Sequence, residues 1–170
     1  MTRDDVPPAA TCIPVLRPQD FGIGILYSTI RDAVIVGDAA TGRIALWSPS
    51  AERLFGYTAE EAVGQPIEIL VPESLKPRHR AGLAAYAETG HGAIVDAEAP
   101  VEVPTLRKDG QALTVELSLS PITTAQVPGR FVLAIVRDVT GRKRAEAARL
   151  ASARVDAAQA AGQRFRGLFN

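Results

Sequence analysis

The 170-residue chain is poor in cysteine, methionine and tryptophan, with one of each, and only 5% of its residues are aromatic. A single thiol, Cys12, cannot form an internal disulfide bond or a metal site built from several thiolates. Lysine and arginine together number 19, as do aspartate and glutamate. Because these charges balance, the chain as a whole has no field that would attract nucleic acid or an anionic membrane. We therefore expect neither as a partner.

Long apolar runs are also missing. The run FVLAIV at 131–136 falls far short of the roughly 20 residues that a transmembrane helix needs. The first residues, MTRDDVPPAA, lack the apolar core of a signal peptide. The sequence therefore predicts a cytoplasmic protein.

Catalytic motifs are not found in this stretch. It has no glycine-rich phosphate loop, no GxSxG elbow and no pair of catalytic carboxylates. A phospho-accepting histidine segment and an ATP-binding lobe are also missing. We therefore expect no enzyme activity here, and any kinase activity would belong to another domain.

Composition divides the chain into three parts. Prolines and few large apolar groups in 1–18 predict a flexible leader. Apolar residues from Asp20 to Ile30 favour a short amphipathic helix that caps the domain, although Gly22 and Gly24 weaken it. We expect one folded domain over 19–140, followed by a helical linker over 141–170.

The first half of the domain contains short strands and capped helices. Strands are expected at 34–36 and 43–47, joined by a glycine turn. Ser48 and Pro49 suit a helix start, because serine caps free amides and proline is tolerated in the first turn. Thr58 and Glu61 have the spacing of a capping box. A longer helix is expected from about 77 to 88.

The second half alternates apolar and polar residues, as half-buried strands do. Strands are expected at 93–103, 113–119 and 130–139, with RKDG at 107–110 as a hairpin turn. Pro100 and Pro104 place the first of these at a sheet edge or bulge. Together with the early strands, the pattern predicts an α+β fold, a five-stranded antiparallel sheet with short helices on one face.

Several motifs resemble those of PAS domains, in the same order, over about residues 28–140. They are DAVIVGD, SAERLFGYTAEE, LRKDG and RDVTGRK. The resemblance implies a cytoplasmic sensory module of a multidomain signal-transduction protein, such as a two-component system with a regulated histidine kinase. Such modules bind a small ligand or cofactor, or a partner, and act on a C-terminal effector, often as homodimers.

The resemblance also implies sites. RDVT matches the family's exit motif, where the last strand passes the signal to a helix, so Arg137, Asp138 and Thr140 are expected to transmit it. The asparagine that the family has after the tryptophan is replaced by Ser48. A small apolar ligand would be held by residues that also suit a plain core, namely Val34, Val36, Leu54, Phe55, Leu83, Tyr86, Leu117, Leu119, Leu133 and Ile135.

His79 raises the question of haem b. The segment VPESLKPRHRAGLAAYAETG resembles the helix of haem-binding PAS oxygen sensors of the FixL type, in which a histidine at this place ligates the iron. Gly82 and Leu83 share its helix face. Where such sensors have arginines near the haem, this chain has Val101 and Ala85. A polar surface histidine is the alternative reading, and His91 is expected to face solvent.

Other chromophores are excluded by the position of the cysteine. A LOV-type flavin adduct and a thioester-linked chromophore each need a cysteine inside the domain, and Cys12 precedes it. Three hypotheses remain: a ligand-binding sensor, a haem-based gas sensor and a ligand-free dimerisation scaffold. Residues 141–161 are rich in alanine and arginine and should form a signalling helix with Leu150 and Val155 as its large aliphatics. Residues 164–169 resemble the opening helix of another PAS repeat.

Overall fold

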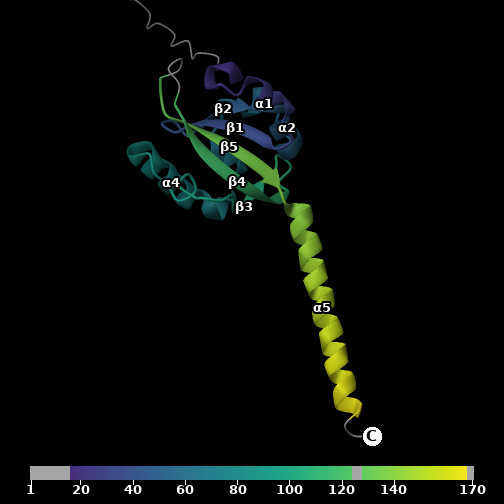
Figure 1. Ribbon diagram of the computed structural model, residues 1–170. Helices are drawn as coiled ribbons and strands as arrows, with labels where there is room; N and C mark the ends of the chain where they lie inside the picture. The colour runs from purple at the N-terminus through teal and green to yellow at the C-terminus, as the bar shows by residue number, and fades with distance from the viewer. Residues whose placement is uncertain (1–15, 124–127, 168–170) are drawn as a thin grey trace, which may run out of the picture.

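The computed structural model describes residues 16–123 and 128–167 and has an α+β architecture (Figure 1). Its centre is a five-stranded antiparallel sheet in the order β2-β1-β5-β4-β3. The last strand of the chain therefore lies in the middle of the sheet, between the first strand and the late hairpin. The strands are β1 (Ala33–Asp38), β2 (Arg43–Trp47), β3 (Val101–Leu106), β4 (Ala112–Ile122) and β5 (Phe131–Asp138).

Short helices follow β2 and cover one face of the sheet, which we call the inner face. They are α2 (Pro49–Phe55), α3 (Ala59–Ala62), the 3-10 turns η2 (Ile67–Leu70) and η3 (Glu73–Leu75), and α4 (Lys76–Thr89). Helix α4 ends at Gly90, whose φ of 77° lies in the left-handed region that glycine adopts without a side-chain clash.

Ser48 begins α2 as expected and also ties the helix to the sheet. Its hydroxyl accepts hydrogen bonds from the amides of Ala51, at 3.2 Å, and of Val34 on β1, at 2.9 Å. The Thr58–Glu61 capping box is likewise present at the start of α3. Because Ser48 is fully buried, the serine supplies the hydrogen bonds that would otherwise be lost at this strand-to-helix junction.

The N-terminal segment covers the opposite, outer face of the sheet. The expected single helix is divided at Gly22, whose φ is 70°, into η1 (Pro18–Phe21) and α1 (Gly24–Thr29). Phe21 contacts Phe131 of β5 edge-on, with 5.1 Å between ring centroids. Helices therefore cover both faces at β1, which explains why all its residues from Ala33 to Val36 are buried.

The main core lies between α2, α3 and the inner face of β1, β2 and β4. Trp47 and Phe55 are buried side by side there, with ring centroids 5.5 Å apart. The Trp47 indole donates its Nε1–H to the carbonyl of Tyr57 at 2.9 Å. Trp47 thus belongs to the inner-face core.

The prediction of a strand over 93–103 is wrong for most of that range. Strand β3 begins only at Val101, because residues before it form a turn in which the Asp96 amide donates to the Gly92 carbonyl at 2.8 Å. The Asp96 carboxylate accepts in return from the Gly92 amide at 3.0 Å. The edge position is confirmed: β3 pairs only with β4, and Pro104 lies within it.

Helix α5 (Thr140–Gly167) begins one residue after β5 and extends away from the domain as a single 28-residue helix (Figure 1). No helix in the described ranges is both long and apolar enough to cross a bilayer. The expected leader, apart from 16–18, and Cys12 lie outside the described residues, as does the end of the segment at 164–169.

Candidate functional site

The predicted pocket residues lie on both faces of the sheet. Side chains alternate along a strand, and Val36 and Leu133 pack with the N-terminal segment on the outer face. Val34 and Ile135, each two residues away, share that outer face. Leu117, Leu54 and Phe55 belong to or contact the inner-face core, and Leu119 alternates with Leu117 on that same face. The outer-face residues and the inner-face residues therefore cannot line one pocket.

The inner face has two differently covered halves. In the packed half, Ile35, Phe55 and Val115 are no more than 2% exposed. In the open half, the side chains are only half-buried, although they too are apolar. The open half consists of Val101, Leu117, Leu119 and Ala134, which lie on the neighbouring strands β3, β4 and β5. This half is where the structure leaves apolar sheet surface incompletely covered.

Helix α4 is held mainly by polar contacts near its two ends. Near its start, Arg80 donates to the Glu68 carboxylate through Nε and Nη2 at 2.8–3.0 Å. At its other end, Arg130 donates to the carbonyls of Tyr86 and Ala87 at 3.1 Å. Tyr86 is itself buried. The helix is therefore fixed at its ends, and its middle residues are largely exposed.

His79 lies on α4 beside the same carboxylate. Its Nδ1 is buried, has no hydrogen-bond partner in the described part of the chain, and is 3.8 Å from Glu68 Oε1. The hydrogen bond from Arg80 to Glu68 lowers the pKa of that carboxyl from its usual value, so Glu68 stays ionised at neutral pH. The His79 side chain is about two-thirds withdrawn from solvent. Among the described residues, no group of three or more histidine, cysteine, aspartate or glutamate side chains is placed to hold a metal ion.

The signal-exit residues connect three parts of the domain. Arg137 forms a bidentate ion pair with Asp32, just before β1, at 2.8 and 3.2 Å. Asp138 accepts from the Thr140 amide at 2.8 Å, as a helix cap does. Thr140 also exchanges hydrogen bonds with the backbone of Thr114 on β4, accepting from its amide at 3.0 Å and donating to its carbonyl at 3.3 Å. The three predicted exit residues therefore lie at one junction.

The first turns of α5 are tied to the late hairpin by ion pairs. Arg142 contacts Glu116 of β4 and Glu102 of β3. Lys143 pairs with Glu102 at 2.6 Å, and that hydrogen bond raises the pKa of the lysine. The same strands carry the open half of the inner face. A displacement of β3 or β4 would therefore act directly on α5.

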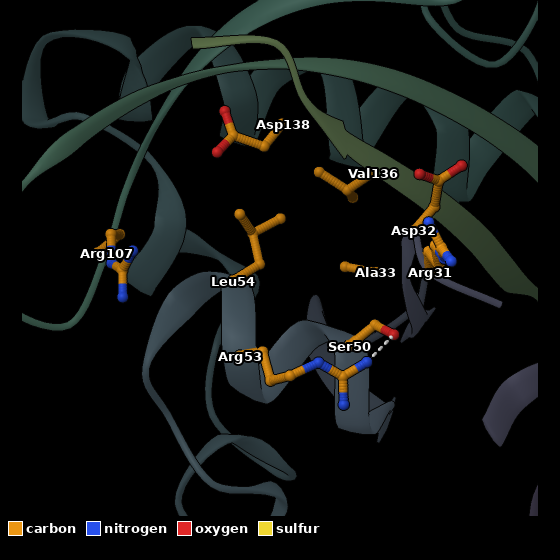
Figure 2. A pocket seen from close by; sticks show the side chains of 9 residues that line it. All are labelled: Arg31, Asp32, Ala33, Ser50, Arg53, Leu54, Arg107, Val136 and Asp138. Atoms are coloured by element: carbon orange, nitrogen blue, oxygen red, sulfur yellow. Dashed lines mark hydrogen bonds between the residues drawn. The ribbon is translucent and has the colours of Figure 1, made fainter. Parts of the chain in front are cut away.

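A pocket of about 260 Å³ lies beside this junction (Figure 2). It is bordered by the start of β1, by α2, by the turn after β3 and by the end of β5. Its lining residues are Arg31, Asp32, Ala33, Ser50, Arg53, Leu54, Arg107, Val136 and Asp138. Of the residues predicted from sequence, only Leu54 and Asp138 line it.

The arginines of this pocket were missed because they come from separate segments. Arg107 belongs to the predicted hairpin turn, where a charged residue is common and does not indicate a binding site. Arg53 has the position of an exposed residue on a short amphipathic helix. The tertiary fold brings these segments together, since the Lys108 amide beside Arg107 donates to the Phe55 carbonyl at 2.9 Å, and no local signal in the sequence records that contact.

The fold and the exit junction define the class to which the chain belongs. The family described as the PAS fold matches residues 25–139, well over half of the chain. The chain is a member of the PAS family, as the motifs in the sequence indicate.

Individual relatives agree with this assignment. Sensor protein FixL of Bradyrhizobium diazoefficiens is 33% identical over 138 residues, which cover 78% of this chain and 25% of that protein. Oxygen sensor protein DosP of Escherichia coli is 27% identical over 116 residues, covering 68% of this chain and 14% of that protein. A crystal structure of a PAS domain from Colwellia psychrerythraea has 27% identity and a TM-score of 0.55, covering 68% of this chain and 92% of the other. The chain spans a quarter or less of the length of these curated relatives.

Proposed function

We propose that this PAS domain senses a small apolar ligand on the open half of its inner face and passes the change to α5. The observation that carries the proposal is the set of ion pairs from Arg142 and Lys143 of α5 to Glu102 and Glu116. These pairs connect the output helix to the strands that form the open half.

The open half suits a ligand because its surface is apolar and incompletely covered. Removing apolar area from water contributes about 25 cal/mol for each Å² that a ligand covers. Leu117 and Leu119 would contribute most of this area from β4, while Tyr86 and Leu83 of α4 would approach from the other side. Since α4 is held at its ends, its middle can adjust without breaking the contacts at Glu68 and Arg130.

The route to the helix is short. A ligand that moves β4 also moves Thr114, which is hydrogen-bonded to Thr140 at the start of α5. The ion pairs at Glu116 and Glu102 would change in the same step. A sensor needs an element with two states. Here that element would be the start of α5, whose contacts depend on the position of the sheet.

Native mass spectrometry of the purified chain tests the ligand. We expect a consistent added mass, lost when Leu119 is replaced by arginine, which would project a charge into the open half. The control is Ser120→Arg, the next residue on the opposite face and exposed. An unliganded mass in every preparation would favour the alternative of a ligand-free dimerisation scaffold.

Transmission is tested in the full-length protein. Asp138→Ala and Thr140→Ala remove the contacts that fix the start of α5, and regulation of the output should be lost while the domain stays folded. The control, Arg144→Ala, changes an exposed residue of the same helix. Regulation that is unchanged in both junction variants would contradict this route.

We further propose that the domain works as a cytoplasmic homodimer that controls a C-terminal effector, such as a histidine kinase. Large aliphatic side chains are exposed on both terminal helices: Ile25 is 77% and Leu26 61% exposed on α1, and Leu150 and Val155 are each 54% exposed on α5. Exposed apolar groups of this kind are typical of interaction surfaces. Analytical ultracentrifugation of Leu26→Glu and Leu150→Glu should show weaker self-association than the unchanged chain.

A haem-based gas sensor is the second candidate, and His79 is the residue that favours it. In proteins, a metal-binding histidine commonly points its other ring nitrogen at a carboxylate. The Nδ1 of His79 lies 3.8 Å from Glu68 Oε1, near that carboxylate but beyond hydrogen-bond distance, which leaves Nε2 as the atom for iron. DosP, a relative described as an oxygen sensor, is similar to this chain over 116 residues. Against it, the half-buried Val101 and the exposed Ala85 offer no charge to a haem propionate or to bound oxygen.

An absorption spectrum decides between the two candidates. Protein purified with haem supplied should show a Soret band that disappears in His79→Ala and persists in His91→Ala, whose side chain is 80% exposed. Colourless protein under these conditions would remove the haem hypothesis. The apolar-ligand proposal would stand, because it does not depend on His79.

A further inference from the structure

We infer that the pocket beside the exit junction is a second binding site, for a small dicarboxylate, separate from the apolar open half. Three arginines, Arg31, Arg53 and Arg107, line it. They come from the segment before β1, from α2 and from the turn after β3. Guanidinium groups bind carboxylates through paired hydrogen bonds, which makes arginine the residue suited to this chemistry.

Arg107 has a donor without an acceptor. Its Nε is withdrawn from solvent and makes no hydrogen bond within the described part of the chain. The nearest carboxylate oxygen, of Asp109, is 4.0 Å away, beyond hydrogen-bond distance. A donor that is withdrawn from solvent without a partner is unfavourable, so a carboxylate in the pocket would stabilise it by accepting its hydrogen bond.

Arg53 is held in place at the other side. Its Nη2 donates to the Ser50 hydroxyl at 2.7 Å, and that hydroxyl in turn donates to the Ile30 carbonyl at 2.7 Å. This chain fixes the guanidinium while its other N–H groups remain available. Figure 2 shows Arg53 and Arg31 on one side of Leu54 and Arg107 on the other.

The distribution of polar and apolar groups selects an elongated ligand. Between the two arginine ends lie the apolar side chains of Leu54, Ala33 and Val136. A molecule with carboxylates at both ends and a short methylene chain between them matches this order. A volume of about 260 Å³ is below the range of about 300–1,000 Å³ of pockets for drug-sized ligands, so the site suits a small metabolite.

The acidic residues in the lining do not cancel this charge. Asp32 is already neutralised by its bidentate pair with Arg137. Asp138 accepts the hydrogen bond of the Thr140 amide. Three arginines and two aspartates line the pocket, and Arg137 adds one further positive charge beside it. The net charge of two is matched by one dianion.

Isothermal titration calorimetry with succinate tests the site, with butyrate, succinamide and inorganic phosphate as comparisons. We expect succinate to bind at least about tenfold more tightly than butyrate, because butyrate lacks the second carboxylate. Succinamide, which is uncharged, should not bind measurably. Phosphate should bind more weakly than succinate, because a compact anion cannot reach both arginine ends.

Variants separate a binding role from a structural one. Arg107→Gln should lower succinate affinity at least about tenfold and make succinate and butyrate bind alike, since one end has lost its partner. Arg53→Gln should have a similar effect. Arg78→Gln, an exposed change on α4, should leave both affinities unchanged. Circular dichroism establishes whether each variant is folded. If Arg107→Gln does not fold, the succinate affinities of Arg31→Gln and Arg53→Gln test the site in its place.

Three results would overturn the inference. They are no heat of binding with succinate, phosphate binding as tight as succinate binding, or unchanged succinate affinity in folded Arg53→Gln and Arg107→Gln. None of them bears on the apolar open half, because the arginines lie outside it.

Discussion

The two halves of the inner face share strands β4 and β5 yet are covered differently. The packed half lies beneath α2 and α3, where Phe55 and Val115 are fully withdrawn from solvent. The open half has equally apolar residues, such as Leu117 and Leu119, that are only partly buried. The difference separates the part of the domain that is packed for stability from the part whose apolar surface is incompletely covered.

The way the helices are attached explains the contrast. Helix α2 is fixed by buried apolar contacts and by the Ser48 hydroxyl. Helix α4 depends on Arg80 and Arg130 near its ends. Apolar packing disappears only when the core opens, whereas surface ion pairs contribute little and exchange easily. Motion within the domain is therefore expected at α4 before it is expected at α2.

Phe55→Ala should have the largest effect, because it removes a buried aromatic ring from the packed half. We expect the free energy of unfolding to fall by about 3–5 kcal/mol. Urea denaturation followed by circular dichroism measures it. A loss below about 1 kcal/mol would mean that the packed half is not the stable centre of the domain.

Ser48→Ala should have the second-largest effect and lower the free energy of unfolding by about 1–3 kcal/mol. The substitution leaves the amides of Val34 and Ala51 without their acceptor at a buried position. The matched control is Ser120→Ala on β4, an exposed position, where the change should stay within about 0.5 kcal/mol. Equal effects at the two serines would contradict the role assigned to the Ser48 hydroxyl.

Leu119→Ala should lower the free energy of unfolding by about 1 kcal/mol, because a half-buried leucine contributes roughly half of the 1.5–3 kcal/mol that a fully buried one contributes. The same denaturation experiment checks it beside Phe55→Ala. If Leu119→Ala destabilised the domain as strongly as Phe55→Ala, the distinction between the halves would fail.

Glu68→Gln should have the smallest effect, and the effect should depend on pH. The Arg80 hydrogen bond lowers the pKa of Glu68 in the folded state, so the pair stabilises the fold above the ordinary pKa of 4.5 and loses that contribution as pH falls through the lowered value. The variant should therefore be less stable at pH 7 by no more than about 1 kcal/mol, and the difference should vanish at low pH. The control, Glu60→Gln, changes an exposed residue of α3 and should alter the free energy of unfolding at pH 7 by no more than about 0.5 kcal/mol.

Local signals in the sequence predicted most of the fold. Caps at Ser48 and Thr58 and the glycines that end α2 and α4 act through neighbouring residues, so their effects can be read locally. The alternation at 93–103 misled because Asp96, Ala97, Glu98 and Ala99 continue the pattern, although aspartate, glutamate and alanine are residues depleted in strands. There a turn at Gly92–Asp96 satisfied the backbone instead.

The candidate sites were less accessible to sequence reasoning. Strand β1 is apolar at every position from Ala33 to Val36, so alternation could not tell which residues face inward. For this reason the sequence pattern groups Val34 and Val36 with inner-face residues, although Val36 packs on the outer face and Val34, two residues away, shares it. The arginine-lined pocket depends on contacts between distant segments, which local patterns do not contain.

The direct passage from β5 into α5 has a mechanical consequence. With 28 residues at about 1.5 Å each, the helix is about 42 Å long, and a tilt of roughly 5° at its root displaces its tip by roughly 4 Å. Only Val139 separates β5 from α5, so there is no flexible linker that could absorb such a rotation. A sub-ångström shift of the central strand β5 would therefore be amplified along the helix into a displacement of its far end by about the width of a side chain.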